Sequence, residues 1–500
     1  MAAADQPPAP GSTAPGPLPG STAPSPATPA ALAARLGDER LDHRFKGLPP
    51  DADGLTADEL AAQRRNVFTG GFTTPLLTLS AESLEHNLAL LGTYAARHGL
   101  AFAPHGKTTM APRLFARQLA HGAWGITVAV PHQVRVCRAF GVGRVFLANE
   151  LVDAAALRWV AGQLADDPGF RFVCYVDSVR GVELMDEALA GSARPVDVVV
   201  ELAAGEGART GVRTEAAALE VAGAAARAAS LRLVGVAGYE AQVPDASPEA
   251  VRAWLRRLVA LAAELDGRGL FADAEEIVLS AGGSEWFDAV AEVFAEVPEL
   301  SAPVLKLLRS GAYVSHDHGH YERLTPFNRV PDEGALAPAF LLWAQVVSRP
   351  TPGEAFLNAG KRDVSYDLAL PVPLLVRSGR DGSVRPAEGL AVTALSDQHA
   401  WLRTAPADGT APAPPAEGTA PAPPAEGTAP APGADGTAGD TADGTVGRTA
   451  GTAPGGCEGL EVGDWVALGL AHPCTVFEKW PMIPVVASDG TAVDYVRTFF

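Results

Sequence analysis

Short apolar runs alternate with longer amphipathic stretches through the middle of the chain. The runs are rich in Val, Leu, Ile and Phe, which is typical of strands in a parallel sheet covered on both faces. The pattern predicts strands at Leu100–Pro104, Gly125–Val128, Val145–Asn149, Phe170–Val176, Val196–Leu202, Leu233–Tyr239, Glu276–Ser280 and Val304–Leu308. Helical spacing of apolar residues predicts helices between them, including Pro131–Phe140, Ala154–Ala165, Val179–Ala190, Thr214–Ala229 and Pro248–Leu265.

Eight strands joined by helices favour one α/β architecture, a (β/α)8 barrel of the TIM type. A doubly wound parallel sheet is the competing architecture. The number of strands favours the barrel. So does the lack of a Gly-x-Gly-x-x-Gly turn after the first strand.

The pattern changes after Pro331. Strand-like segments then follow one another with turn residues and without long helices, at Leu341–Ser348, Glu354–Asn358, Gly389–Leu395, Asp464–Leu470 and Met482–Val486. We therefore expect a barrel over residues 74–330 and a mostly β domain over residues 331–500.

Glycine and proline are concentrated in two low-complexity segments. The chain has 52 Gly and 42 Pro among 500 residues. Many of them lie in a tail over residues 1–30 and in an insertion over residues 404–456, which repeats a nine-residue unit at Gly409–Glu417 and Gly418–Glu426. Such segments bury too little apolar surface to offset chain entropy, so we expect both to be disordered.

The charge balance narrows the choice of partners. The 39 Lys and Arg against 58 Asp and Glu give a formal net charge of −19, which argues against nucleic acid or an anionic membrane as the partner. No apolar run is long enough to span a membrane, and the N-terminal tail lacks the features of a secretion signal. The four cysteines form no Cys-x-x-Cys pair, so we expect a cytoplasmic protein.

Candidate chemistry lies at the C-terminal ends of the predicted barrel strands. Lys107 follows the first strand, where partial burial would lower its pKa and make the amine a nucleophile and base. Gly-Lys-Thr at 106–108 is not a phosphate-binding P-loop, because Ala101 stands where that motif needs Gly. Glycine-rich loops follow the seventh and eighth strands, where barrels commonly bind phosphate. A lysine and a phosphate loop in these places suggest pyridoxal phosphate.

An ordered set of motifs resembles one enzyme family. The matching segments are Thr74–Leu79, Pro104–Thr108, Arg209–Gly211, Gly238–Glu240, Ser280–Ser284, Ser310–Tyr313 and His472–Cys474. From about Thr74 to Phe500 the chain resembles the fold type III pyridoxal-phosphate enzymes, which have an alanine-racemase-like barrel. Within them it is similar to the D-serine dehydratase and D-threonine aldolase branch, which includes proteins called amino acid deaminases.

The resemblance implies roles for individual residues. Lys107 matches the lysine that holds pyridoxal phosphate as a Schiff base and removes the Cα proton. Arg209 and Tyr239 match residues beside the cofactor. The phosphate loop and its continuation match Ser280, Gly282, Gly283, Ser284, Gly311 and Tyr313. His472 and Cys474 match a metal pair, and nitrogen and thiolate ligands suit Zn²⁺.

Other histidines offer alternatives. His316, His318 and His320 form a rival metal cluster, or else a polar loop at the barrel mouth. His399 occupies the place of a family histidine and is a candidate substrate contact, although it could equally be a hairpin histidine with a satisfied hydrogen bond.

The expected activity is that of a lyase that deaminates a D-3-hydroxy amino acid such as D-serine to a 2-oxo acid and ammonia. An open zinc site would assist loss of the hydroxyl as a Lewis acid. The alternatives are D-threonine aldolase-type cleavage of the Cα–Cβ bond and, in another class, a non-catalytic pyridoxal-phosphate carrier. The resemblance also implies a homodimer.

Overall fold

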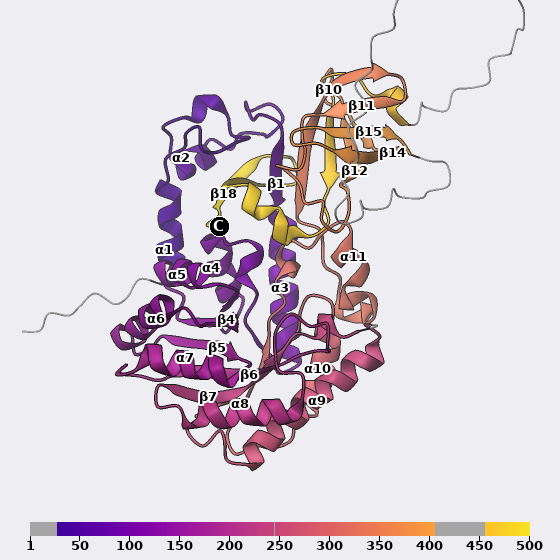
Figure 1. Cartoon of the computed structure of the whole chain (residues 1–500). Helices are drawn as coiled ribbons and strands as arrows, with labels where there is room; N and C mark the ends of the chain where they lie inside the picture. The colour runs from indigo at the N-terminus through magenta and orange to yellow at the C-terminus, as the bar shows by residue number, and fades with distance from the viewer. Residues whose placement is uncertain (1–27, 245, 406–455) are drawn as a thin grey trace, which may run out of the picture.

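The computed structural model describes residues 28–244, 246–405 and 456–500 (Figure 1). Apart from their edges, the predicted tail and insertion lie outside the described residues. The described chain forms a barrel, in purple to magenta at the bottom of Figure 1, and a mostly β domain, largely in orange and yellow, above it.

The barrel contains all eight predicted strands, which are parallel and ordered β2-β9-β8-β7-β6-β5-β4-β3. They are β2 (Ala101–Phe102), β3 (Ile126–Val128), β4 (Arg144–Glu150), β5 (Arg171–Val176), β6 (Val196–Leu202), β7 (Leu231–Gly238), β8 (Ile277–Ala281) and β9 (Val304–Leu308). The two end strands are joined by a parallel bridge between His105 and Thr127. The predicted TIM-type barrel is therefore confirmed.

Helices surround the strands and include all five that the sequence predicts. They are α3 (Ala81–Arg97), α4 (Pro112–Ala120), α5 (Pro131–Ala139), α6 (Ala154–Asp166), α7 (Val179–Leu189), α8 (Glu215–Arg227), α9 (Pro248–Gly267) and α10 (Phe287–Ala295). Side chains at the helix starts explain several boundaries. Asp153, for example, accepts hydrogen bonds from the backbone N–H groups of Ala155 and Ala156 and so caps α6.

Successive side chains along each barrel strand point to opposite faces of the sheet. They fill two separate apolar layers, one inside the barrel and one between the strands and the helices. In β6, Val199 packs inside the barrel with side chains such as Phe146, Val234 and Val278. Its neighbours Val198 and Val200 belong to the layer between the strands and the helices. Because both faces of the strands are buried, the strands are nearly all apolar in the sequence.

The second domain is built on a branched, mostly antiparallel sheet, whose main path runs β13-β12-β16-β10-β1-β17-β18, with β11, β15 and β14 branching from β10. Its strands are β1 (Leu76–Ser80), β10 (Phe340–Thr351), β11 (Glu354–Leu357), β12 (Val372–Arg377), β13 (Val384–Pro386), β14 (Leu390–Leu395), β15 (Ala400–Thr404), β16 (Trp465–Gly469), β17 (Met482–Val486) and β18 (Ala492–Arg497). The five strands predicted after Pro331 are present. Residues 76–80, expected at the start of the barrel, instead form β1 of this sheet, because they pair with β10 and β17.

Contacts between the two ends of the chain join the domains. Of the N-terminal helices, α2 (Ala57–Ala62) packs against β18, whereas α1 (Pro29–Ala34) packs against α4 of the barrel (Figure 1). Arg113, on α4 of the barrel, forms ion pairs with Asp58 of α2 and Asp494 of β18. Near the C-terminus, the backbone N–H of Phe499 donates to the carbonyl of Met110, 2.9 Å away. The segment after β2 is therefore fixed against the second domain.

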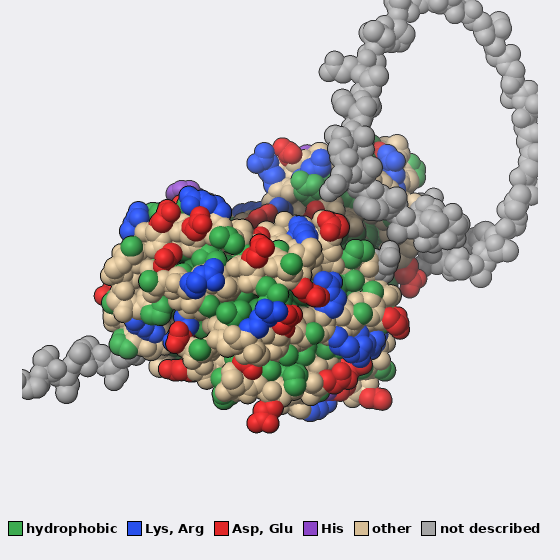
Figure 2. Space-filling view, turned by 60° about the horizontal axis from the view of Figure 1, so that its bottom comes forward, with side chains coloured by type: hydrophobic (Ala, Val, Ile, Leu, Met, Phe, Trp, Pro, Cys, Tyr) green, Lys and Arg blue, Asp and Glu red, His purple; other side chains and the backbone are tan. Residues whose placement is uncertain are grey.

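Charges of both signs cover the helical face of the barrel. Figure 2 shows Lys and Arg side chains interspersed with Asp and Glu, and ion pairs such as Arg252–Glu292 and Arg268–Glu264 involve helix α9. Among the described helices, none is both long and apolar enough to cross a membrane.

Candidate active site

A cavity of about 510 Å³ lies where the C-terminal ends of the barrel strands face the loop after β16. Barrel residues line most of it, and His472 and Cys474 of the second domain line the rest. The sequence-predicted site residues that line it are Lys107, Arg209, Tyr239, Gly283, Ser284, Gly311, His472 and Cys474. Tyr321, from the short helix α11 (His320–Leu324), also lines it.

The turn that carries Lys107 is fixed by close packing. Lys107 lies in a single 3₁₀ turn, Gly106–Thr108, directly after β2. A Cβ on Gly106 would lie 2.7 Å from a methyl carbon of Ile126 and 2.9 Å from the Phe115 ring, so any larger residue would force these side chains to shift. The Met110 N–H donates to the Gly106 carbonyl at 2.8 Å. The turn is thus held against the barrel and presents Lys107 to the cavity.

The surroundings of Lys107 shift its amine toward the neutral form. Burial lowers the pKa of Lys107, and the nearby Arg209 and Arg309 guanidinium groups lower it further, while Cys474 opposes the shift. A neutral amine is the form that attacks a carbonyl or accepts a proton. The predicted role of this lysine is thus chemically reasonable in this cavity.

The glycine loop after β8 contacts a buried carboxylate as well as the cavity. The backbone N–H groups of Gly282 and Gly283 donate to Glu240 at 2.9 and 2.5 Å. Burial raises the pKa of Glu240, and these two amides oppose the rise. Because Glu240 occupies both amides, a phosphate would have to bind farther along, near Ser284 and Gly311. The sequence offered one clue to Glu240, its place directly after Tyr239.

Two arginines line the cavity in different settings. Arg209 is exposed, and its guanidinium lies 5.6 Å from the centre of the Tyr239 ring. Arg309 is buried, and it donates to the carbonyl of Gly238. Sequence reasoning missed Arg309, although a charged residue directly after the last barrel strand was a usable signal.

The predicted metal pair lies on the second domain and faces Lys107. Burial by itself raises the pKa of the Cys474 thiol, but His472, Thr108 and Lys107 more than offset this and lower it overall. Burial likewise opposes charge on His472, yet Cys474 and Asp367 raise its pKa to about 9. Thr108 Oγ1 lies 3.4 Å from Cys474 Sγ, so the pair directly contacts the Lys107 turn.

Several predicted residues lie outside the cavity lining. Ser280 is buried and donates to the carbonyl of Leu307, Tyr313 accepts from Gln118, and Gly282 binds Glu240. His399 lines a separate hollow beside Trp401 on the second domain. The structure therefore does not bring these four together with Lys107.

The three histidines of the rival cluster lie in different environments. His316 and His318 are largely buried, whereas His320 forms an ion pair with Glu285 at 2.9 Å. Among the residues that the structure describes, no three His, Cys, Asp or Glu side chains gather as a metal site. Two protein ligands, His472 and Cys474, would leave positions open on a metal.

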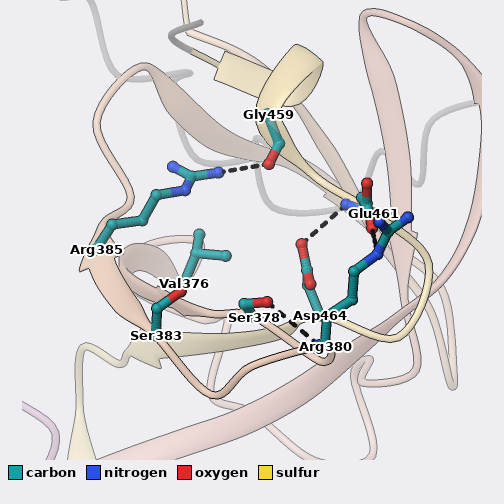
Figure 3. Close-up of a pocket in the computed structure, with 8 residues that line it drawn as sticks. All are labelled: Val376, Ser378, Arg380, Ser383, Arg385, Gly459, Glu461 and Asp464. Carbon is teal, nitrogen blue, oxygen red and sulfur yellow. Dashed lines mark hydrogen bonds and ion pairs between the residues drawn. The ribbon is translucent and has the colours of Figure 1, made fainter. Parts of the chain in front are cut away.

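A further hollow on the second domain offers little chemistry (Figure 3). Its charged groups are engaged with protein partners: Arg380 with Glu461, Arg385 with the carbonyl of Gly459, and Asp464 with the N–H of Glu461. We therefore place the candidate site in the cavity around Lys107.

Unpartnered polar atoms show that the cavity suits a polar ligand. Within the described residues, buried atoms without a hydrogen-bond partner include Nδ1 of His105, the hydroxyl of Tyr175, Oε2 of Glu201 and Nε of Arg309. All four residues line the cavity. Because such atoms are costly to leave unpaired, they indicate a bound polar molecule or water. Together with Lys107, Ser284 and Gly311, they fit pyridoxal phosphate.

Comparison with known families agrees with this geometry. Residues 79–297 match the alanine racemase N-terminal domain, and residues 339–419 match a serine dehydratase domain. The chain is thus similar to alanine racemases over its barrel and to serine dehydratases over part of its second domain. Its two matched regions correspond to the barrel and to part of the second domain.

The chain is also similar to curated relatives in sequence and to solved structures in fold. The chain is 28% identical over 340 residues to a D-threonine aldolase from Arthrobacter sp, covering 67% of this chain and 80% of that protein. It is 28% identical over 307 residues to a 3-hydroxy-D-aspartate aldolase from Paracoccus denitrificans, covering 60% and 74%. Its fold is similar to that of a D-threonine aldolase from Filomicrobium marinum, with a TM-score of 0.62, 21% identity and coverage of 86% and 95%.

A D-threo-3-hydroxyaspartate dehydratase from Delftia sp. HT23 has the same fold. The TM-score is 0.60 at 20% identity, and the match covers 87% of this chain and 99% of that one.

Proposed function

We propose that this chain is a pyridoxal-phosphate-dependent lyase that converts a D-3-hydroxy amino acid to a 2-oxo acid and ammonia. The main support is that Lys107 and the His472–Cys474 pair line one cavity. This arrangement can place a base near the substrate Cα and a metal near its hydroxyl. The curated relatives named above act, by their names, on D-amino acids of this kind.

Lys107, Ser284 and Gly311 would hold the cofactor, which when bound supplies an electron sink for the charge that develops at the substrate Cα. The Lys107 amine would accept the Cα proton, and its lowered pKa shifts it toward the neutral form that this step requires. Loss of hydroxide from Cβ would then leave an enamine. This product would tautomerise and hydrolyse in water to the 2-oxo acid and ammonia.

His472 and Cys474 would hold the metal, and a nitrogen and a thiolate together suit Zn²⁺. Bound there, the metal would act as a Lewis acid that stabilises the departing hydroxyl. One of the structural neighbours is a D-threo-3-hydroxyaspartate dehydratase with a cysteine replaced by alanine, in the metal-free form.

Cleavage of D-threonine-like substrates to glycine and an aldehyde is the second candidate, supported by the D-threonine aldolase relative. Cys474 favours the dehydratase, because its thiolate suits Zn²⁺. The aldolase side of the branch prefers harder metals, which a carboxylate in the place of Cys474 would suit. A carrier without catalytic activity would have no use for His472 and Cys474.

A substrate panel on the purified protein separates these functions. The proposal predicts pyruvate from D-serine, loss of activity with a chelator and recovery with Zn²⁺. Glycine and acetaldehyde from D-threonine, without a 2-oxo acid, would select the aldolase. Cofactor binding without turnover of any D-amino acid would select the carrier. Light scattering on the same sample tests the expected homodimer.

A further inference from the structure

His472 has a backbone conformation that needs support from its neighbours. Its φ of 63° and ψ of 76° lie in the left-handed region, which residues other than glycine rarely adopt. Such a residue persists only where surrounding contacts fix it, and these residues concentrate at functional sites.

Two carboxylates from different parts of the fold provide those contacts. Asp317 is fully buried in the loop after β9, and its Oδ2 accepts the backbone N–H of His472 at 2.9 Å. Its Oδ1 accepts the N–H of Tyr321, also at 2.9 Å. Asp317 therefore ties the barrel side of the cavity to His472.

Asp367 holds the imidazole ring itself. It lies between β11 and β12, and its Oδ2 is 2.5 Å from His472 Nδ1. Its Oδ1 accepts the hydroxyl of Thr475 at 3.1 Å, so both carboxylate oxygens are engaged. Ser365, two residues earlier, donates to the carbonyl of Ala471. The Asp367 segment is thus anchored to the same loop that it orients.

We infer that Asp367 is a positioning residue for the metal site, fixing the His472 ring so that Nε2 faces the metal. The inference rests on the proposed function, which places a metal on His472 and Cys474. A carboxylate that accepts Nδ1–H selects the tautomer with a free electron pair on Nε2 and increases the basicity of the ligand. Carboxylates in this position typically change metal affinity by about 10- to 100-fold.

The test measures Zn²⁺ affinity of the full-length protein by competition with a chromophoric chelator. Asp367→Ala should bind Zn²⁺ about 10- to 100-fold more weakly than wild type. Asp367→Asn should recover part of that loss, because its amide oxygen can still accept Nδ1–H. Asp397→Ala, which removes an exposed carboxylate paired with Arg362, is the matched control and should bind as wild type does.

Co²⁺ absorbance separates a positioning role from general damage. The cobalt–thiolate band should persist in Asp367→Ala at saturating metal, because Cys474 is unchanged. Equal Zn²⁺ affinity in wild type and Asp367→Ala would overturn the role of Asp367 and leave the proposed function intact. Failure of wild type itself to bind Zn²⁺ would overturn the metal site of the proposed function and this inference with it.

Discussion

The barrel wall and the β-domain wall of the cavity are held in place by different kinds of contact. On the barrel wall, Lys107 sits on a turn fixed by apolar packing around Gly106 and by the strand before it. On the β-domain wall, His472 is held in a left-handed conformation by Asp317 and Asp367. The first wall depends on shape and the second on hydrogen bonds between distant segments.

This difference predicts how each wall fails. Changes on the barrel wall should cost cofactor binding or folding stability. Changes on the β-domain wall should cost metal binding and rate while the cofactor stays bound.

The largest effect is expected from Lys107→Ala. Loss of the base and of the covalent cofactor link should lower kcat/KM for D-serine by about 10⁴-fold or more. Lys361→Ala, which removes a lysine outside the cavity, is the control and should keep its rate. Steady-state kinetics check this, and a Lys107→Ala rate within tenfold of wild type would contradict it.

Cys474→Ala should reduce the rate by about 10²- to 10³-fold, the scale seen when one charge-stabilising group is removed. The visible cofactor band should remain, because Lys107 is intact. Cys137→Ala removes a buried cysteine of α5 and serves as the control. Zinc content and absorbance spectra distinguish the two variants. Loss of the cofactor band in Cys474→Ala would show that the two walls are not independent.

Acid should destabilise the loop after β9, which joins the two walls of the cavity through the hydrogen bond from His472 to Asp317. Burial lowers the pKa of His316 and His318 to about 4, with Asp317 opposing the shift. In the unfolded chain these rings titrate near their ordinary value of about 6.5, so below that pH the unfolded state takes up protons first. Stability should therefore fall from about pH 6.5 to pH 4, by about 3 kcal/mol per ring.

Urea unfolding of wild type and His318→Gln between about pH 6.5 and pH 4 measures how much the His318 ring contributes to the loss of folding stability. The variant should lose less stability on acidification than wild type. Parallel curves for the two proteins would contradict the assignment to His318.

The smallest effect is expected from Gly106→Ala. The added methyl group would clash with Ile126 and Phe115, at a cost of about 1–3 kcal/mol. Gly162→Ala, in α6 with open space around it, should be neutral or slightly stabilising. Thermal unfolding compares the two, and equal shifts in Tm would argue against close packing at the Lys107 turn.

The barrel could be predicted because its strands carry their own signal. Each is a short apolar run between helices, and burial on both faces makes that run stand out, as in Val196–Leu202. Strands of the second domain are harder to predict. β13 has three residues and ends in Pro386, and β1 lies ahead of the barrel although it pairs with β10 and β17.

The residues of the candidate site likewise differ in how well the sequence predicts them. Lys107 and the Ser284 and Gly311 segments could be located because strand ends place them at the barrel mouth. Arg309 and Glu240 had weaker signals of the same kind, whereas Asp317 and Asp367 had none, since their importance lies in contacts with segments far away in the sequence. Asp367, for example, is 105 positions from His472. Local pattern cannot report such a contact.

The lysine that carries the cofactor can be identified directly. The chain has five lysines, all within the described residues, and Lys107 is the one among them that lines the cavity. Reduction of the pyridoxal-phosphate-loaded protein with borohydride, followed by peptide mass spectrometry, identifies the lysine that carries the cofactor. We predict a single pyridoxyl adduct on Lys107. An adduct on Lys46, Lys306, Lys361 or Lys479 in its place, or none at all, would contradict the account.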